Sequence, residues 1–166
     1  FCSSTNSSLS MPYVDGGAQE HGMRAGTENI ASIVGMAAAL KKNCDHMDQT
    51  QNKLHQLEDK FLDVLKLSGI DFTRNGSANH IPGNVNVSIR NVSGEMLLHR
   101  LDLKGIAIST GSACDSVNTQ VSHVIQAIRV PKEYAHGTIR VSFGRDNEES
   151  DAVEIAKAIV DILKTK

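Results

Sequence analysis

The order of periodic segments constrains the fold of this sequence more than any other feature. Two long stretches with apolar residues at helical spacing come first, around residues 30–40 and 54–65, and Gly69 ends the second. Short apolar segments typical of strands follow, interleaved with helical segments, at residues 70–73, 85–89, 106–108 and 138–143. This order predicts an α+β fold, in which a long helical pair precedes a small sheet that helices pack against.

Polar residues predict where the helices begin. Thr27 follows a glycine-rich segment and is placed to cap the first helix, and the polar stretch 43–49 separates the two long helices. Ser93 is expected to cap a helix that ends at Gly105, and Asn147 to start the last helix. Glycines before a helix start can also hold an anion such as phosphate, although a plain N-cap explains Thr27 equally well.

Composition excludes several classes of partner. The 166 residues carry 17 basic and 19 acidic side chains without blocks, giving a net charge of -2, so no basic surface for nucleic acid or membranes is expected. The three cysteines, Cys2, Cys44 and Cys114, are odd in number and widely spaced, which favours a reducing compartment over a disulfide framework. We therefore expect a soluble protein of the cytoplasm or, in a eukaryote, of an organellar matrix.

The segment Ser109–Cys114 is the first candidate functional element. It follows the predicted strand 106–108, consists of small side chains, and ends in a cysteine that Asp115 and Ser116 follow. A structural cysteine is normally surrounded by apolar neighbours, so this context favours an exposed, reactive thiol on a loop that can move. An ordinary surface loop would have a similar composition.

Arg140 is the second candidate. Ile139, Val141 and Phe143 alternate along the predicted strand 138–143, which places Arg140 on the opposite face, away from the core. Taken alone, it could equally be a surface arginine.

Three motifs, in this order, resemble those of class I cysteine desulfurases of the NifS/IscS type, within the class V aminotransferase family. Residues 16–29 (GGAQEHGMRAGTEN) are similar to the family's GGxQExGxRxGTxN segment. Residues 109–114 (STGSAC) resemble its SSGSAC loop, with Ser-His-Val at 122–124 after it. Residues 135–145 (AHGTIRVSFGR) resemble its AHxxIRxSxGR strand. The resemblance covers residues 11–166 and the C-terminal portion of the family's chain.

The resemblance implies a fold and an activity. Residues 1–26 would be the edge or remnant of a large domain that binds pyridoxal phosphate, and residues 27–166 the small C-terminal domain of a fold type I enzyme, with its linking helices. The enzyme would remove sulfur from L-cysteine to give alanine, form a persulfide on Cys114, and deliver the sulfur to an acceptor such as an iron-sulfur scaffold protein. The family acts as a homodimer, without nucleic acid or membrane partners.

The resemblance also implies roles for three residues. Cys114 would be the nucleophile, and at most a transient iron-sulfur ligand, with no other metal site. Arg140 would bind the α-carboxylate of the substrate, a task suited to the planar guanidinium. Thr27 would contact the cofactor phosphate of a neighbouring subunit.

The cofactor-binding lysine of the family has no counterpart here. None of the ten lysines lies in a matching context, so we expect this chain alone not to hold pyridoxal phosphate covalently and to be inactive by itself. The chain could be a fragment, a separately encoded half or a degenerate remnant.

Other functions are also compatible with the residues. The domain could act without catalysis, as a persulfide carrier or as an interaction module for a sulfur acceptor. A protease-like pair of Cys114 and His136 has no supporting motif, and the seven histidines and three cysteines show no common metal-ligand spacing.

Overall fold

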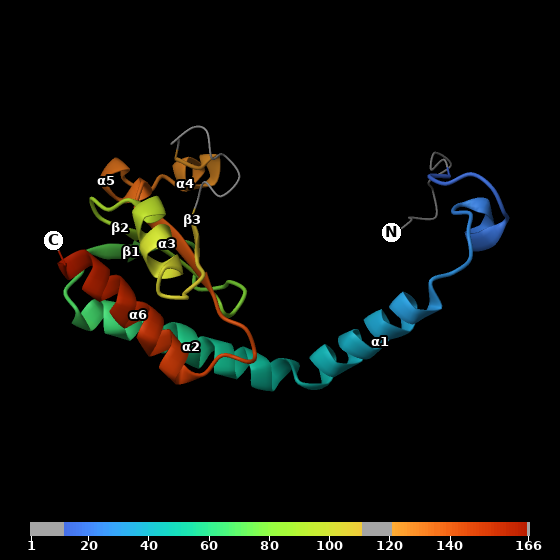
Figure 1. The fold of residues 1–166 in the computed structure, drawn as a ribbon, viewed down its shortest axis with the longest axis horizontal. Coiled ribbons are helices and arrows are strands. Elements are labelled where there is room, and N and C mark those ends of the chain that lie inside the picture. The colour runs from blue at the N-terminus through green and yellow to red at the C-terminus, as the bar shows by residue number, and fades with distance from the viewer. Residues whose placement is uncertain (1–11, 111–120, 166) are drawn as a thin grey trace. The chain divides into compact units, whose positions relative to one another are not determined.

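The computed structural model describes residues 12–110 and 121–165 (Figure 1). The chain divides into two compact units, one ending at His46 and the other beginning at Met47. Among the described residues, no helix has both the length and the apolar character needed to cross a membrane.

The first unit contains a short 3-10 helix, η1 (Gln19–Gly22), and the helix α1 (Ile30–Asp45). The cap of α1 is Asn29, whose side chain accepts a hydrogen bond from the Ser32 backbone N–H at 3.1 Å. The prediction that Thr27 caps this helix is therefore wrong, because the asparagine two residues later supplies the side-chain oxygen.

The second unit begins with α2 (Met47–Leu67), the longest helix. Only His46 separates it from α1, so the polar stretch 43–49 lies mostly within helices. Leu57, Phe61 and Leu65 recur at every fourth position and are almost completely buried. Gly69, with a φ of 76°, follows the end of α2, as predicted.

Four antiparallel strands form one sheet in the order β1-β2-β4-β3. They are β1 (Phe72–Arg74), β2 (Asn84–Ile89), β3 (Ser109–Thr110) and β4 (Thr138–Ser142).

Strand β3 begins later than the sequence predicted, at Ser109 instead of Ile106. The Ile106 N–H donates to the Leu101 carbonyl at 2.9 Å, so this backbone completes the end of a helix before it can join a sheet. Ile106 and Ile108 still pack against the core.

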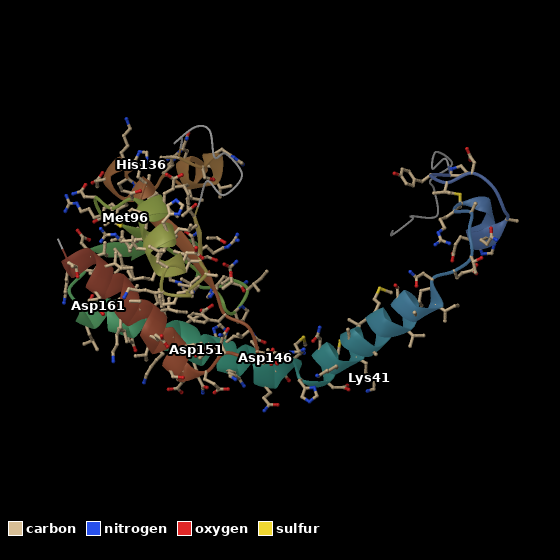
Figure 2. The ribbon with its side chains drawn as sticks, in the orientation of Figure 1. Lys41, Met96, His136, Asp146, Asp151 and Asp161 are labelled. Atoms are coloured by element: carbon tan, nitrogen blue, oxygen red, sulfur yellow. The ribbon has the colours of Figure 1, made fainter. Side chains whose placement is uncertain are left out.

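The other helices of this unit are α3 (Gly94–Asp102), α4 (His123–Ala127), α5 (Lys132–Ala135) and α6 (Glu149–Lys164). Ser93 caps α3, as predicted, by accepting from the Met96 N–H. Helix α6 is capped at Glu148, whose N–H donates to the Asp151 carboxylate at 3.0 Å, one residue later than predicted. Figure 2 shows Asp151 near the beginning of α6 and Asp161 near its end.

The core lies between the helices and one face of the sheet. Helices α2 and α6 lie side by side (Figure 1), and the buried residues Val85, Val87, Ile139 and Val141 of the two central strands join them in one apolar cluster. Polar residues alternate with these along both strands and occupy the other face. The α+β prediction, with a small sheet packed by helices after a long helical pair, is confirmed.

Candidate functional site

Arg140 lies on the polar face of the sheet, in the interior strand β4. It is exposed while both of its neighbours, Ile139 and Val141, are buried, so the predicted orientation is confirmed. Its partner in β2 is Asn86 and its partner in β3 is Ser109. Directly opposed residues in antiparallel strands point to the same face, so these three residues form one polar row across the sheet.

The guanidinium of Arg140 keeps most of its donors available. Its Nη2 donates to the Ser109 hydroxyl at 3.2 Å. Within residues 12–110 and 121–165 it forms no ion pair with a carboxylate. A guanidinium has five N–H donors in a planar fork, so this one can accept a carboxylate in two parallel hydrogen bonds.

A hydrogen-bonded network holds the strands beneath Arg140 together. The Asn75 amide donates to the Asn86 side-chain oxygen and to the Ser88 hydroxyl, each at 2.7 Å. The Ser88 and Thr138 hydroxyls are buried and 2.7 Å apart. Because these groups are satisfied within the protein, they fix the register of β2 on β4.

Sequence reasoning missed the supporting role of Asn86 and Ser88. The signal was available, because the alternation of valines at 85 and 87 already placed these two residues on the face of Arg140.

Cys114 lies outside the described residues, so the prediction that it is exposed stays a prediction. The described residues place the beginning of its loop, however. Ser109 pairs with Arg140 and Thr110 with Ile139, so the chain that leads to Cys114 leaves the sheet beside Arg140. Cys114 follows Thr110 by four positions in the sequence, so even a fully extended chain would place their Cα atoms at most about 14 Å apart.

Thr27 belongs to the first unit and is exposed. The Arg24 guanidinium donates to the carbonyls of Gly26 at 2.8 Å and Thr27 at 3.3 Å, which fixes the backbone just before α1. The Thr27 hydroxyl has no hydrogen-bond partner among the described residues. An exposed hydroxyl next to a cation and a helix start suits a phosphate group, so these residues fit the phosphate of a cofactor.

Two histidines that follow Cys114 in the sequence lie at helix ends. His123 is the first residue of α4, after the cap Ser122. His136 ends α5, and its carbonyl accepts from the Gly94 N–H at 2.8 Å.

No described lysine is buried. Lys41, Lys53, Lys60 and Lys66 pair with carboxylates on helices or helix ends.

Comparison with known proteins identifies close matches over most of the chain. Residues 3–155 match the family model for class-V aminotransferases. The cysteine desulfurase IscS of Dictyoglomus turgidum is 40% identical over 158 residues, which cover 93% of this chain and 40% of that protein. The IscS of Methanosarcina thermophila is 36% identical over 153 residues, which cover 92% of this chain and 38% of that protein.

The comparison with solved structures identifies the same kind of protein. A NifS-like protein superimposes with a TM-score of 0.78 at 29% identity, over 94% of this chain and 39% of that one. A NifS-like protein from Rickettsia africae has a TM-score of 0.69 at 26% identity, over 93% of this chain and 39% of that one. The chain thus spans about two-fifths of the length of the relatives it matches.

Proposed function

Because the chain belongs to the class-V aminotransferase family, we propose that it forms the C-terminal part of a cysteine desulfurase that takes sulfur from L-cysteine. The observation that supports the proposal is the pairing of Ser109 with Arg140, since it brings the start of the cysteine loop next to a guanidinium that forms no ion pair with a carboxylate of the described residues. Enzymes of this family depend on pyridoxal phosphate.

Arg140 binds the substrate in this proposal. The α-carboxylate of L-cysteine accepts two hydrogen bonds from the guanidinium, which orients the substrate side chain. Strand β4 is suited to this role because it is an interior strand with buried neighbours on the opposite face, so the arginine has a rigid base.

Cys114 accepts the sulfur. Bound pyridoxal phosphate supplies the electron-withdrawing group that activates the substrate for loss of its sulfur. The Cys114 thiolate attacks the substrate sulfur, a new S–S bond forms, the C–S bond breaks, and the carbon takes a proton. One thiol and one cysteine thereby become one persulfide and one alanine, with atoms and electrons balanced. The persulfide then passes its outer sulfur to an acceptor, such as an iron-sulfur scaffold protein.

Thr27 contributes to the cofactor site. Its exposed hydroxyl and the neighbouring Arg24 suit the cofactor phosphate, which in a homodimer would be that of the neighbouring subunit. The three widely spaced cysteines favour a reducing compartment, the cytoplasm or an organellar matrix, and the net charge of -2 offers no excess of basic residues for nucleic-acid or membrane partners.

The proposal is tested in the complete enzyme by measuring alanine release and, by mass spectrometry, persulfide on Cys114. Arg140→Ala should lower kcat/KM by about tenfold to a hundredfold, mainly through KM, because it removes charged hydrogen bonds to the substrate. Ser142→Ala, on the same face two residues along, is the matched control and should leave kcat/KM unchanged. Cys114→Ala should abolish persulfide formation.

An unchanged KM in Arg140→Ala, or a persulfide in Cys114→Ala, would refute these assignments. A protein that accepts sulfur on Cys114 from a sulfane donor but never releases alanine from cysteine would instead be a persulfide carrier.

A further inference from the structure

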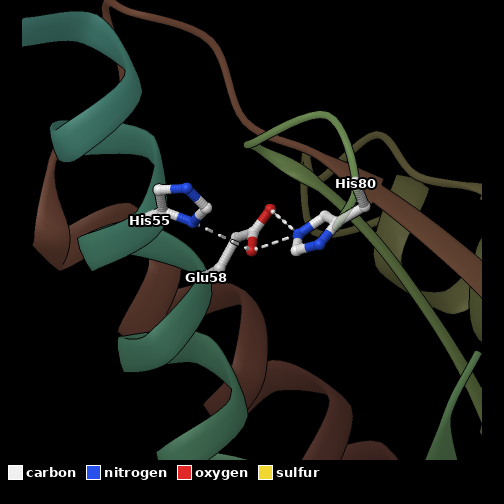
Figure 3. Close-up of side chains that lie close together, drawn as sticks. All are labelled: His55, Glu58 and His80. Atoms are coloured by element: carbon white, nitrogen blue, oxygen red, sulfur yellow. Dashed lines mark hydrogen bonds and ion pairs between the residues drawn. The ribbon is translucent and has the colours of Figure 1, made fainter. Parts of the chain in front are cut away.

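Two histidines and a buried glutamate form a second cluster of side chains that could bind a ligand. His55 and Glu58 lie three residues apart in α2, so they share one face of the helix, and His80 lies in the connection between β1 and β2 (Figure 3). One ligand atom from each lies within 4.8 Å of the other two. Imidazole nitrogen and carboxylate oxygen are the donors that zinc-like divalent ions bind.

Glu58 is the centre of the cluster, and its side chain is only 2% exposed. Its Oε1 accepts from the Gly83 N–H, and its Oε2 faces both histidines, at 2.8 Å from His80 Nε2 and 3.9 Å from His55 Nδ1. The backbone N–H thus orients the carboxylate and leaves one oxygen directed at the imidazoles, an arrangement typical of groups that support metal ligands.

The tautomer of His80 favours a cation at Nε2. His80 Nδ1 lies 3.0 Å from the carbonyl oxygen of Ala78, which can only accept, so Nδ1 carries a proton. In the neutral ring, Nε2 then presents a lone pair toward the Glu58 carboxylate, whose oxygens are also acceptors, at 2.8 and 3.1 Å.

Arg74 occupies this position. Its Nη2 carries two N–H groups and lies 2.6 Å from His80 Nε2 and 3.1 Å from Glu58 Oε2, so it can donate to both lone pairs. A positive charge is thus already held between the imidazole and the carboxylate, and a divalent ion in place of the guanidinium would accept the same two lone pairs.

From this geometry we infer that His55, Glu58 and His80 form a site for a divalent transition-metal ion of the zinc type, with Arg74 displaced into solvent. The Arg74 side chain is 34% exposed and lies on the edge strand β1, so it has room to leave. Tetrahedral ligands of zinc lie about 3.4 Å apart. His55, with a side chain 43% exposed, needs only a small rotation to close the site, and a water molecule completes the coordination.

The metal would connect α2 to the segment that joins β1 and β2. Since it binds the folded state, it should raise the apparent melting temperature of the chain, and the increase should grow with metal concentration. This role is independent of sulfur transfer, because none of the three ligands belongs to the polar face of the sheet.

The test is titration of the full chain with Zn²⁺ by calorimetry, after its thiols are blocked with N-ethylmaleimide so that cysteines cannot bind the ion. We expect one Zn²⁺ per chain and, with Co²⁺ as probe, the visible absorption of a tetrahedral site. His55→Ala, at a half-exposed position that tolerates substitution, should weaken binding at least tenfold, and His80→Ala likewise. His99→Ala, an exposed histidine of α3, is the control and should bind as tightly as the parent.

Arg74→Ala should bind Zn²⁺ more tightly than the parent, because it removes the competing cation. Circular dichroism of each variant checks that it is folded. Absence of binding in the parent chain, equal binding by His55→Ala, or weaker binding by a folded Arg74→Ala would overturn the inference.

Discussion

One added methyl group at Gly83, in the connection between β1 and β2, should lower the stability of the fold for two separate reasons. Its φ is 84°, a backbone conformation that favours glycine, and its N–H donates to the buried Glu58 carboxylate. A Cβ at Gly83 would lie 2.7 Å from the Phe143 carbonyl oxygen and 3.0 Å from a methyl of Leu54. The carbonyl cannot rotate away, because the Phe143 N–H donates back to the Gly83 carbonyl at 2.7 Å.

Gly76 lies in the same connection between β1 and β2, and a variant there measures the cost of the left-handed backbone without the cost of steric overlap. Its φ is 96°, and a Cβ there would meet nothing within 4 Å. Gly76→Ala should therefore lower the free energy of unfolding by about 1–2 kcal/mol, for the left-handed backbone alone. Gly83→Ala carries the same cost and adds about 1–3 kcal/mol for the steric overlap. Alanine also reduces the conformational entropy of the unfolded chain, which raises the free energy of unfolding by a similar amount in both variants. This contribution therefore cancels when the two variants are compared.

The measurement is urea unfolding of both variants and the parent, followed by circular dichroism. Gly83→Ala should have the lower midpoint of the two, with m-values similar to the parent. If Gly83→Ala is no less stable than Gly76→Ala, the close approach to Phe143 does not exist in solution, and the reasoning from the backbone geometry is wrong.

Three further predictions concern stability. Phe61→Ala should lower the free energy of unfolding by about 3–5 kcal/mol in urea unfolding, because the ring is completely buried and packs edge-on against Phe143. The Asn147 amide and a backbone N–H lower the pKa of Asp151, so this carboxylate stabilises the fold above the ordinary value of 3.8, and that stabilisation is lost as pH falls through the lowered pKa. Asp151→Asn should therefore be less stable than the parent at pH 7, and unfolding curves should show the difference shrinking below pH 3.8. Asn29→Ala should reduce helix content by circular dichroism and cost about 1 kcal/mol, because it removes the cap of α1.

The alternation of apolar residues was sufficient to predict the two central strands of the sheet, but not the edge strand β3, which was predicted at 106–108 and lies at Ser109–Thr110. Val85, Val87, Ile139 and Val141 specified two buried strands, and the face that Arg140 occupies followed from the same period of two. The boundaries were less predictable, because they depend on which polar side chain reaches a backbone N–H. Asn29 caps α1, and although threonine is also a common capping residue, Thr27 lies two residues too early to cap it.

The candidate site was predictable only where it depends on local sequence. The motif around Arg140 identified the residue, but its neighbours come from strands more than thirty residues away in the chain, so pairing with Ser109 and Asn86 could not be read from spacing. The cluster of His55, Glu58 and His80 was even less predictable from the local sequence. Its third member lies 22 residues from Glu58 on another element, and no short motif joins them.

The topology of the sheet bears on how the proposed substrate binding and sulfur transfer would be coupled. Strand β4 is paired on both sides, so Arg140 is held firmly, whereas β3 lies at the edge of the described sheet and is joined to β4 through two residue pairs up to Thr110, the last residue described before the cysteine loop. A short edge strand contributes few hydrogen bonds and can detach at low cost compared with an interior one. The proposed nucleophile follows the weakly held strand and the proposed carboxylate ligand sits on the firmly held one. In the proposed enzyme, Arg140 would therefore hold the substrate fixed while Cys114 takes up and then delivers the sulfur, and lengthening the β3–β4 pairing should slow delivery of sulfur to an acceptor more than its uptake from cysteine.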